Sequence, residues 1–86
     1  MQTQEANGGG TSDLLALRPL LDYRQSREHV FRSEQSLQWF VRRHKSRLVD
    51  AGALIMLSGR WHVVPGRFDA IVLEAGQAAA RQQTAS

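Results

Sequence analysis

Cysteine is absent from the 86-residue chain, which excludes disulfide bridges and any zinc or redox site built on thiolates. Long hydrophobic runs are absent too. The longest nearly apolar stretch, residues 14–21, is interrupted by Arg18 and Pro19 and is far shorter than the roughly 18 residues that a membrane span needs. The first residues lack the basic stretch and apolar core of a signal peptide. We therefore predict a cytoplasmic protein with no membrane partner.

The chain also has few residues arranged for chemistry. His29, His44 and His62 are far apart in sequence, and none stands beside a nucleophile with a supporting carboxylate. The carboxylates lack the spacing of a calcium loop or of a His-Glu-x-x-His zinc helix, and the glycines at 8–10 precede no phosphate-binding Gly-Lys-Ser/Thr element. We predict a protein that is not an enzyme and has no catalytic residues, no metal site and no cofactor.

What the chain has in excess is positive charge, almost all of it arginine. Eleven basic residues, ten of them Arg, stand against eight acidic ones, for a net charge of +3. Residues 24–67 hold nine of these cations and three acids, a local balance of +6. Arg binds phosphate and guanine in bidentate geometry. A chain of this length forms one small domain, so we expect a compact binding module for an acidic partner such as DNA.

Hydrophobic periodicity predicts the secondary structure of the central part. Residues 33–51 have apolar residues at three- and four-residue spacing, with Ser33 as N-cap and Gly52 as the stop. Two β-like runs follow at 53–57 and 60–64, separated by a two-residue Ser-Gly turn typical of a hairpin. Helical spacing returns from Arg67, and this last helix either ends at Gly76 or continues through the alanines at 78–80.

The domain is expected to span residues 13–80, between a disordered tail at 1–12 and a frayed end at 81–86. Ser12 or Asp13 is expected to cap a short helix, and Pro19 to begin a second turn. Residues 29–31 are either a brief strand or a turn. The predicted core contains the following apolar side chains: Leu17, Leu21, Leu37, Phe40, Val41, Leu48, Leu54, Met56, Trp61, Val63, Phe68, Ile71 and Val72.

The polar side of the helix at 33–51 is the feature that can carry function. A helix fits the major groove of B-DNA, where Gln pairs with adenine and Arg with guanine. The groups available are those of Arg32, Gln35, Gln38, Arg42, Arg43, Lys45 and Ser46. The alternative is the ordinary solvated face of a surface helix, and the sequence leaves both interpretations open.

Trp39 and the hairpin add two further signals. A tryptophan on the polar side of a helix is either covered by another element or exposed for a purpose. We favour cover by the segment at 14–23 over a dimer contact or stacking on a nucleotide. Arg60 lies near the hairpin tip, where a cation reaches phosphates or the minor groove. The hairpin can equally be a plain ribbon that closes the core, and the two roles are compatible.

The order of these elements resembles that of a known family. The stretch from Leu57 to Asp69, LSGRWHVVPGRFD, is similar to the end of excisionase-like, MerR-type winged helix-turn-helix domains. Residues 32–41 are similar to the entry of the recognition helix in that family, and residues 50–54 to its exit. The block at 31–74 also resembles small proteins of prophages, filamentous phages and integrated elements. The resemblance implies an α+β fold, with helices packed on a two- or three-stranded β-hairpin wing.

The resemblance also implies a function and a partner. It places DNA contacts on the helix and at the wing, and with the cations noted above the predicted DNA-binding set is Arg32, Gln35, Ser36, Trp39, Arg42, Arg43, Lys45, Arg60 and Arg67. We expect a protein that binds double-stranded DNA, and a homodimer is one expected form. It controls excision, integration or lysogeny of a mobile element as an accessory factor or repressor. The alternative is an antagonist that binds a phage repressor, excisionase or integrase rather than DNA.

Overall fold

The structure is a computed structural model that describes residues 14–85. After a helical turn at 14–16, the elements are β2 (Arg18–Pro19), α2 (Leu20–Ser26), α3 (Glu34–Asp50), β3 (Leu54–Leu57), β4 (Arg60–Val63) and α4 (Pro65–Ala85). The fold is α+β with a three-stranded antiparallel sheet, which confirms the predicted class. The expectations for the tail at 1–12 and for a cap at Ser12 or Asp13 lie outside the described residues.

Helix α3 begins and ends where the sequence predicts. At its start, the Ser36 backbone N–H donates to the Ser33 hydroxyl and the Ser33 N–H donates to the Ser36 hydroxyl. At its end, Gly52 has φ +73° and donates to the Val49 carbonyl, while the next N–H, that of Ala53, donates to the Leu48 carbonyl. These two bonds define a Schellman motif, in which glycine adopts the left-handed conformation without steric cost.

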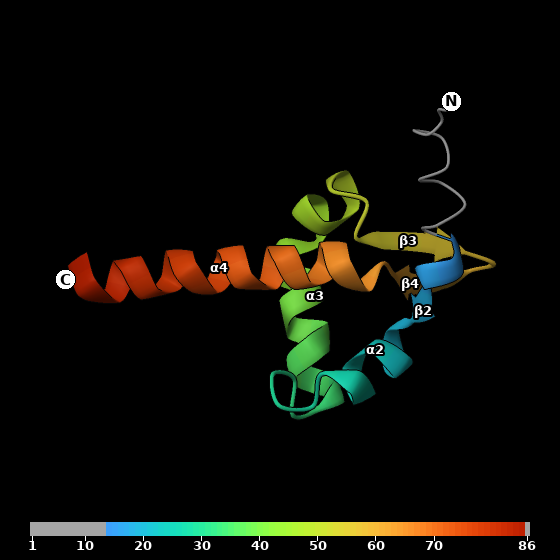
Figure 1. Cartoon of the computed structure of the whole chain (residues 1–86), viewed down its shortest axis with the longest axis horizontal. Coiled ribbons are helices and arrows are strands. Elements are labelled where there is room, and N and C mark those ends of the chain that lie inside the picture. The colour runs from blue at the N-terminus through green and yellow to red at the C-terminus, as the bar shows by residue number, and fades with distance from the viewer. Residues whose placement is uncertain (1–13, 86) are drawn as a thin grey trace.

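The β-hairpin is confirmed, and the structure adds a third strand. Ser58 and Gly59 both have positive φ, as a two-residue type I′ turn requires, and Leu57 pairs with Arg60 across it. The strand order is β2-β4-β3, with Arg18 opposite Val63. The sequence did not predict the two-residue strand β2. The hairpin points away from the helices, toward the right of Figure 1.

Helix α4 is longer than predicted at both ends. It begins at Pro65, two residues before the expected start, because proline suits the first position of a helix. It passes through Gly76 and continues to Ala85, across residues where a frayed end was expected. The alanines at 78–80 have the highest helix propensity and offset the single glycine. In Figure 1 the helix crosses α3 and then extends to the left beyond the rest of the protein.

The core is built around four aromatic rings from different parts of the chain. Phe68 of α4 lies with its ring centroid 4.7 Å from Tyr23, 5.8 Å from Phe40 and 6.4 Å from Phe31. Within the described residues, eight aliphatic side chains are buried together with these rings: Leu37, Val41, Leu48, Ala53, Leu54, Val63, Val64 and Ile71. The sheet and α2 cover one side of α3, and α4 covers another.

Several predicted core residues are elsewhere. Leu21 and Met56 are exposed, so their assignment to the core was wrong. Leu21 lies about 200° around α2 from the buried Tyr23, and Met56 stands in the outer half of a hairpin that extends beyond the helices. Leu17, Trp61 and Val72 are only partly buried, the latter two packed against the core. Tyr23, Phe31, Ala53 and Val64 were missed.

Candidate nucleic-acid interface

The outer face of α3 brings together several residues of the predicted DNA-binding set. At 100° per residue, Gln35 and Arg42 lie opposite the buried Leu37, with Trp39 and Arg43 beside them. Ser46 follows a kink at His44, whose backbone is not helical (φ −116°, ψ 22°). All five outer side chains are exposed. We call Gln35, Trp39, Arg42, Arg43 and Ser46 the α3 outer face. It presents hydrogen-bond donors, a cation pair and one large aromatic ring to solvent.

The cations of this face are not neutralised by carboxylates. Neither Arg42 nor Arg43 forms an ion pair in the part of the chain that the structure describes. The guanidinium carbon of Arg43 lies 5.4 Å from the centre of the Trp39 ring, an attractive cation–π arrangement that leaves the charge in place. Both guanidinium groups can therefore contact an anionic partner.

Trp39 is not covered in the way that we favoured. Its side chain is 56% exposed, so the prediction that residues 14–23 bury it was wrong. Helix α2 instead lies along the side of α3 that carries Leu37 and Gln38, where Leu20 and Leu21 border a small hollow. Trp39 lies on a different side of α3, near the turn that contains Val30. Of the two interpretations of Trp39, the structure is compatible with the second, in which the ring is exposed for a contact.

Lys45 connects α3 to the sheet. Its ammonium nitrogen lies 5.6 Å from the centre of the Trp61 ring on β4. The two residues share a shallow hollow of 210 Å³ with Gln38 and Arg42 of α3. The basic side of α3 therefore reaches the sheet at Trp61.

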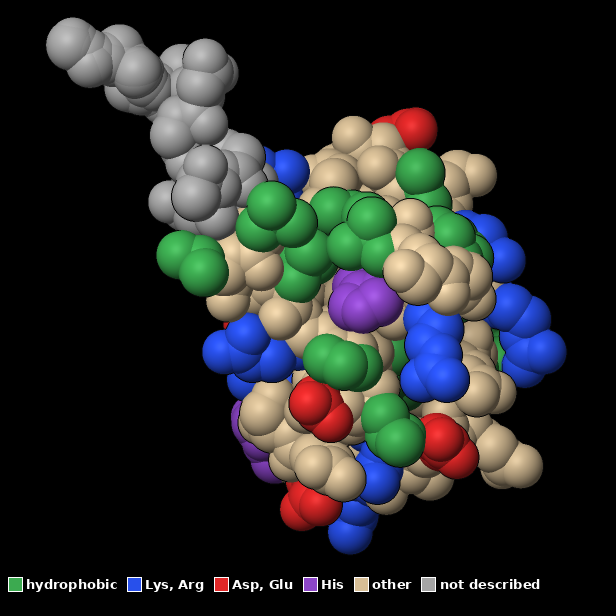
Figure 2. All heavy atoms as spheres, turned by 90° about the vertical axis from the view of Figure 1, so that its right-hand side faces the viewer, with side chains coloured by type: hydrophobic (Ala, Val, Ile, Leu, Met, Phe, Trp, Pro, Cys, Tyr) green, Lys and Arg blue, Asp and Glu red, His purple; other side chains and the backbone are tan. Residues whose placement is uncertain are grey.

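Arg60 is the cation of the hairpin. It is exposed and directly follows the turn of Ser58 and Gly59. Figure 2 looks onto the end of the molecule toward which the hairpin points, and shows Lys and Arg side chains on the right, on the left and at the lower edge of the view. Hydrophobic side chains occupy much of the upper half of that face. The hairpin thus offers a second basic contact outside α3.

The three remaining predicted residues have different positions. Arg32 is exposed and immediately precedes the N-cap of α3. The Ser36 hydroxyl is engaged in the cap, where it donates to the Ser33 carbonyl at 2.7 Å. The guanidinium group of Arg67 lies beside Gly52, at the C-terminal end of α3. It occupies the space that a Cβ at Gly52 would need. The structure therefore places Arg32 at the N-terminal end of α3 and Arg67 at its C-terminal end.

Two other arginines are held by acidic residues and stabilise the fold. Arg27 donates two hydrogen bonds to the Asp69 carboxylate, at 2.9 and 2.7 Å, and the Tyr23 hydroxyl donates a third at 2.6 Å. The Arg27 hydrogen bonds hold the pKa of Asp69 below its usual range, whereas burial, and then the Asp69 contact, raises the pKa of Tyr23. Arg47 pairs with Glu74 of α4.

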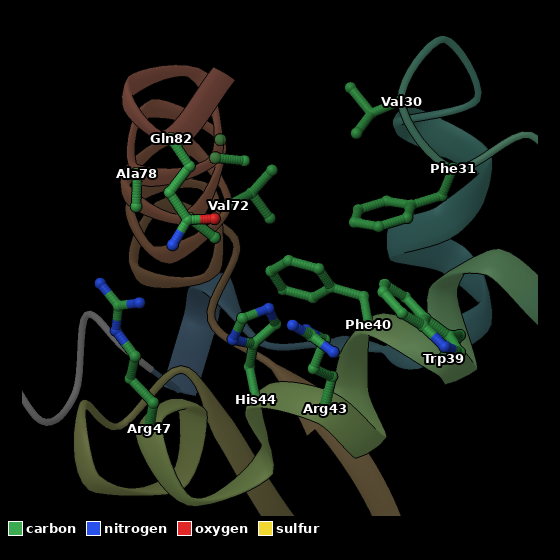
Figure 3. A pocket seen from close by; sticks show the side chains of 13 residues that line it. Val30, Phe31, Trp39, Phe40, Arg43, His44, Arg47, Val72, Ala78 and Gln82 are labelled. Carbon is green, nitrogen blue, oxygen red and sulfur yellow. The ribbon is translucent and has the colours of Figure 1, made fainter. Parts of the chain in front are cut away.

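A groove between α3 and α4 is a feature that the sequence did not predict. It has a volume of 500 Å³ and borders Trp39, Arg43 and His44 on α3 and the alanines 78 and 79 on α4 (Figure 3). Burial, and then the charges of Arg43 and Arg47, lower the pKa of His44. The position of α4 relative to α3 leaves no local pattern in the sequence, so the groove was not predicted. A tryptophan on the polar side of a helix was its one sequence signal.

Two other kinds of site are not found in the described part of the chain. No helix within residues 14–85 combines the length and the apolar character that a membrane crossing requires. Over the same residues, no cluster of three or more His, Asp or Glu side chains is placed to hold a metal ion. The α3 outer face with Arg32, Lys45 and Arg60 is therefore the strongest candidate site in the described part of the chain.

Comparison of the chain with family models, with curated proteins and with solved structures gives no match in any of the three. The winged-helix resemblance consequently stays a prediction that depends on the residues quoted for it.

Proposed function

We propose that this protein binds duplex DNA through the α3 outer face, with the hairpin as a second contact. In this proposal it is a small, non-enzymatic regulator of a mobile genetic element that controls excision, integration or lysogeny, as the excisionase-like resemblance implies. By occupying or bending a DNA site it changes which other proteins act there.

The order of elements supports a winged-helix interpretation of the fold. A helix (α2), a turn and a second, longer helix (α3) are followed by an antiparallel hairpin, and the preceding strand β2 closes the sheet. In helix-turn-helix proteins the second helix enters the major groove. Here that helix is α3, and it carries exposed Gln and Arg side chains. The connection at residues 27–33 is longer than the three- or four-residue turn of the simplest members of this class.

One observation carries the proposal: Gln35, Arg42 and Arg43 are exposed on the outer side of α3, and neither arginine forms an ion pair in the described part of the chain. Cations that stabilise a fold are usually paired, as Arg27 and Arg47 are here. Unpaired arginines beside an amide side chain form a surface that can contact phosphates and base edges together.

Charge reversal tests the proposal. We expect the double variant Arg42→Glu, Arg43→Glu to bind a mixed duplex DNA at least about tenfold more weakly than the wild type in fluorescence anisotropy at low salt, since each lost arginine contact costs about 1–3 kcal/mol. The matched control is Arg81→Glu, because Arg81 is exposed on the far part of α4. Circular dichroism confirms that each variant folds. Equal affinity of the folded double variant and the wild type would exclude groove binding by α3.

A second candidate function is favoured by the exposure of Trp39 beside the apolar groove. In that case the protein binds another regulator, such as an integrase, excisionase or repressor, and acts as its antagonist. Binding to such a partner that survives nuclease treatment and high salt would support this alternative, because DNA bridging and phosphate contacts would both be lost under those conditions.

A further inference from the structure

The groove between α3 and α4 exposes apolar surface that a monomer leaves in water. Its apolar lining includes Val30 and Trp39, the partly buried Val72, and the edges of the buried Phe31 and Phe40. Val30 and Trp39 are both about half exposed. Figure 3 shows Phe31 and Phe40 pointing toward α4 from the opposite side of the groove, with Arg43 and Arg47 on its α3 side. A groove with this lining is suited to an apolar occupant.

One wall of the groove is the part of α4 that extends beyond the rest of the protein. The described side chains after Ala75 are exposed, and we call residues 76–85 the α4 extension. The side that faces the groove carries Gly76, Ala78, Ala79 and Gln82, none of them charged. Arg81, the one charged residue of the extension, lies on another side of the helix. Isolated helical segments this short are marginal in water, so the extension gains stability from a packing partner.

We propose that the occupant of this groove is the α4 extension of a second copy of the chain. A two-fold axis between two copies would place each extension in the groove of the other copy, since the same helix both forms the wall and supplies the occupant. The two extensions would then pack antiparallel. Their small side chains allow the helix axes to approach closely, and the partner helix would cover Val30 and the side of Trp39 that borders the groove. In the dimer the DNA contacts would then fall to the other residues of the α3 outer face.

Charge also favours this occupant. The last turn of α4 contains no basic residue, so nothing on that turn compensates the partial negative charge of its carbonyl groups. In the antiparallel arrangement this end of the helix approaches α3 of the other copy, where Arg43 and Arg47 border the groove. A basic occupant would be repelled by the same two arginines.

The area that such a contact buries can be compared with that of a standard stable interface. A ten-residue helix is about 15 Å long, and burying half its circumference together with the facing groove covers about 600 Å² per copy. That is somewhat below the roughly 800 Å² per partner of a standard stable interface. We therefore expect a reversible dimer with a micromolar dissociation constant.

Sedimentation velocity of the full chain without DNA tests the proposal, from about 1 to 300 µM, a range that brackets such a constant. We expect the wild type to shift from monomer to dimer, Ala79→Glu to remain monomeric, and Ala80→Glu to dimerise like the wild type, because Ala80 does not border the groove. Circular dichroism confirms that both variants fold. A wild type that stays monomeric throughout, or a dimer that Ala79→Glu leaves intact, would overturn the proposal.

Trp39 fluorescence supplies a second measurement that reports the groove itself. In a Trp61→Phe background Trp39 is the only tryptophan, and its emission is expected to shift to shorter wavelength as the dimer forms and not to shift in Ala79→Glu. A dimer without this shift would place the interface elsewhere. A shift that needs an added peptide, with the protein itself monomeric, would assign the groove to a different partner. Neither assay contains DNA, so their failure is distinct from failure of the proposed DNA binding.

Discussion

Asp69 connects helix α4 to helix α2 and the residue that follows it. It lies on α4 and accepts hydrogen bonds from Tyr23 of α2 and from Arg27 just after α2, residues 46 and 42 positions away in sequence. Its carboxylate is partly exposed, so water weakens the ion pair, but the paired geometry with the Arg27 guanidinium is the strong form of this contact. The cluster therefore fixes the position of α2 relative to α4.

The first prediction concerns the acid sensitivity that Asp69 confers. Because the pKa of Asp69 is lower in the folded chain than in the unfolded chain, its ionised form stabilises the fold above about pH 4, and this contribution is lost as the pH falls through the lowered pKa. We expect Asp69→Asn to cost about 1–2 kcal/mol at pH 7 and to lose less stability between pH 5 and pH 3 than the wild type. Urea unfolding at several pH values measures both effects. Asp22→Asn, at an exposed acid of α2, is the control, and parallel acid profiles for Asp69→Asn and the wild type would contradict the prediction.

The second prediction concerns His44. Its ring centroid lies 4.4 Å from that of Phe40, and burial together with the neighbouring arginines lowers its pKa. The folded chain therefore resists protonation of His44, and the fold loses stability as the pH falls below the ordinary histidine value of about 6.5. We expect an NMR titration of His44 with a midpoint below that value. Arg43→Ala should move the midpoint upward, and Arg42→Ala, on the outer face, should leave it in place. A midpoint at or above the ordinary value would refute this account.

At the scale of elements, local signals determine α3 and the hairpin. The Ser33 cap, the glycine stop at Gly52 and the Ser-Gly turn each satisfy backbone groups within a few residues, and all three were predictable. Arg67 adds a restraint from outside the helix, because its guanidinium group occupies the space beside Gly52. Gly52 is therefore required both by its positive φ and by its neighbour.

The third prediction is a pair of glycine substitutions with opposite signs. Gly52→Ala is expected to destabilise the protein by about 1–2 kcal/mol, since alanine is strained at positive φ and its Cβ would displace Arg67. Gly66→Ala, inside α4 with open space around it, is expected to stabilise the protein by about 0.5 kcal/mol through the unfolded chain. Thermal and urea denaturation measure both changes. Equal effects of the two substitutions would contradict this interpretation of the α3 terminus.

Contacts between residues that are far apart along the chain could not be predicted from the sequence. Phe31 belongs to a run too short to show a period, and Tyr23 follows a broken apolar segment, so neither indicated a core position. The Tyr23–Asp69 contact leaves no local pattern at all. For the candidate site, the periodicity of α3 predicted the outward position of Gln35, Arg42 and Arg43. It could not predict that Trp39 would be exposed, because that depends on which side of α3 the preceding helix covers.

At the scale of the whole molecule, two groups of basic residues have different surroundings. Arg27 and Arg47 are paired with acids and hold α4 in place. Arg32, Arg42, Arg43, Lys45 and Arg60 are exposed on or near α3 and the hairpin, and none forms an ion pair within residues 14–85. A net charge of +3 understates this second group, because the acids that offset it are largely elsewhere in the chain. The central claim is that this group forms the DNA-contacting surface.

The salt dependence of duplex binding tests that claim most directly. If the five exposed cations contact phosphates, the logarithm of the association constant falls with the logarithm of salt concentration at a slope of about −4 to −5. Replacing both Arg42 and Arg60 by alanine should then reduce the magnitude of the slope by about 2, since each phosphate contact contributes roughly 0.9. Absence of binding at low salt, or the same slope for the wild type and for this folded double variant, would contradict the account.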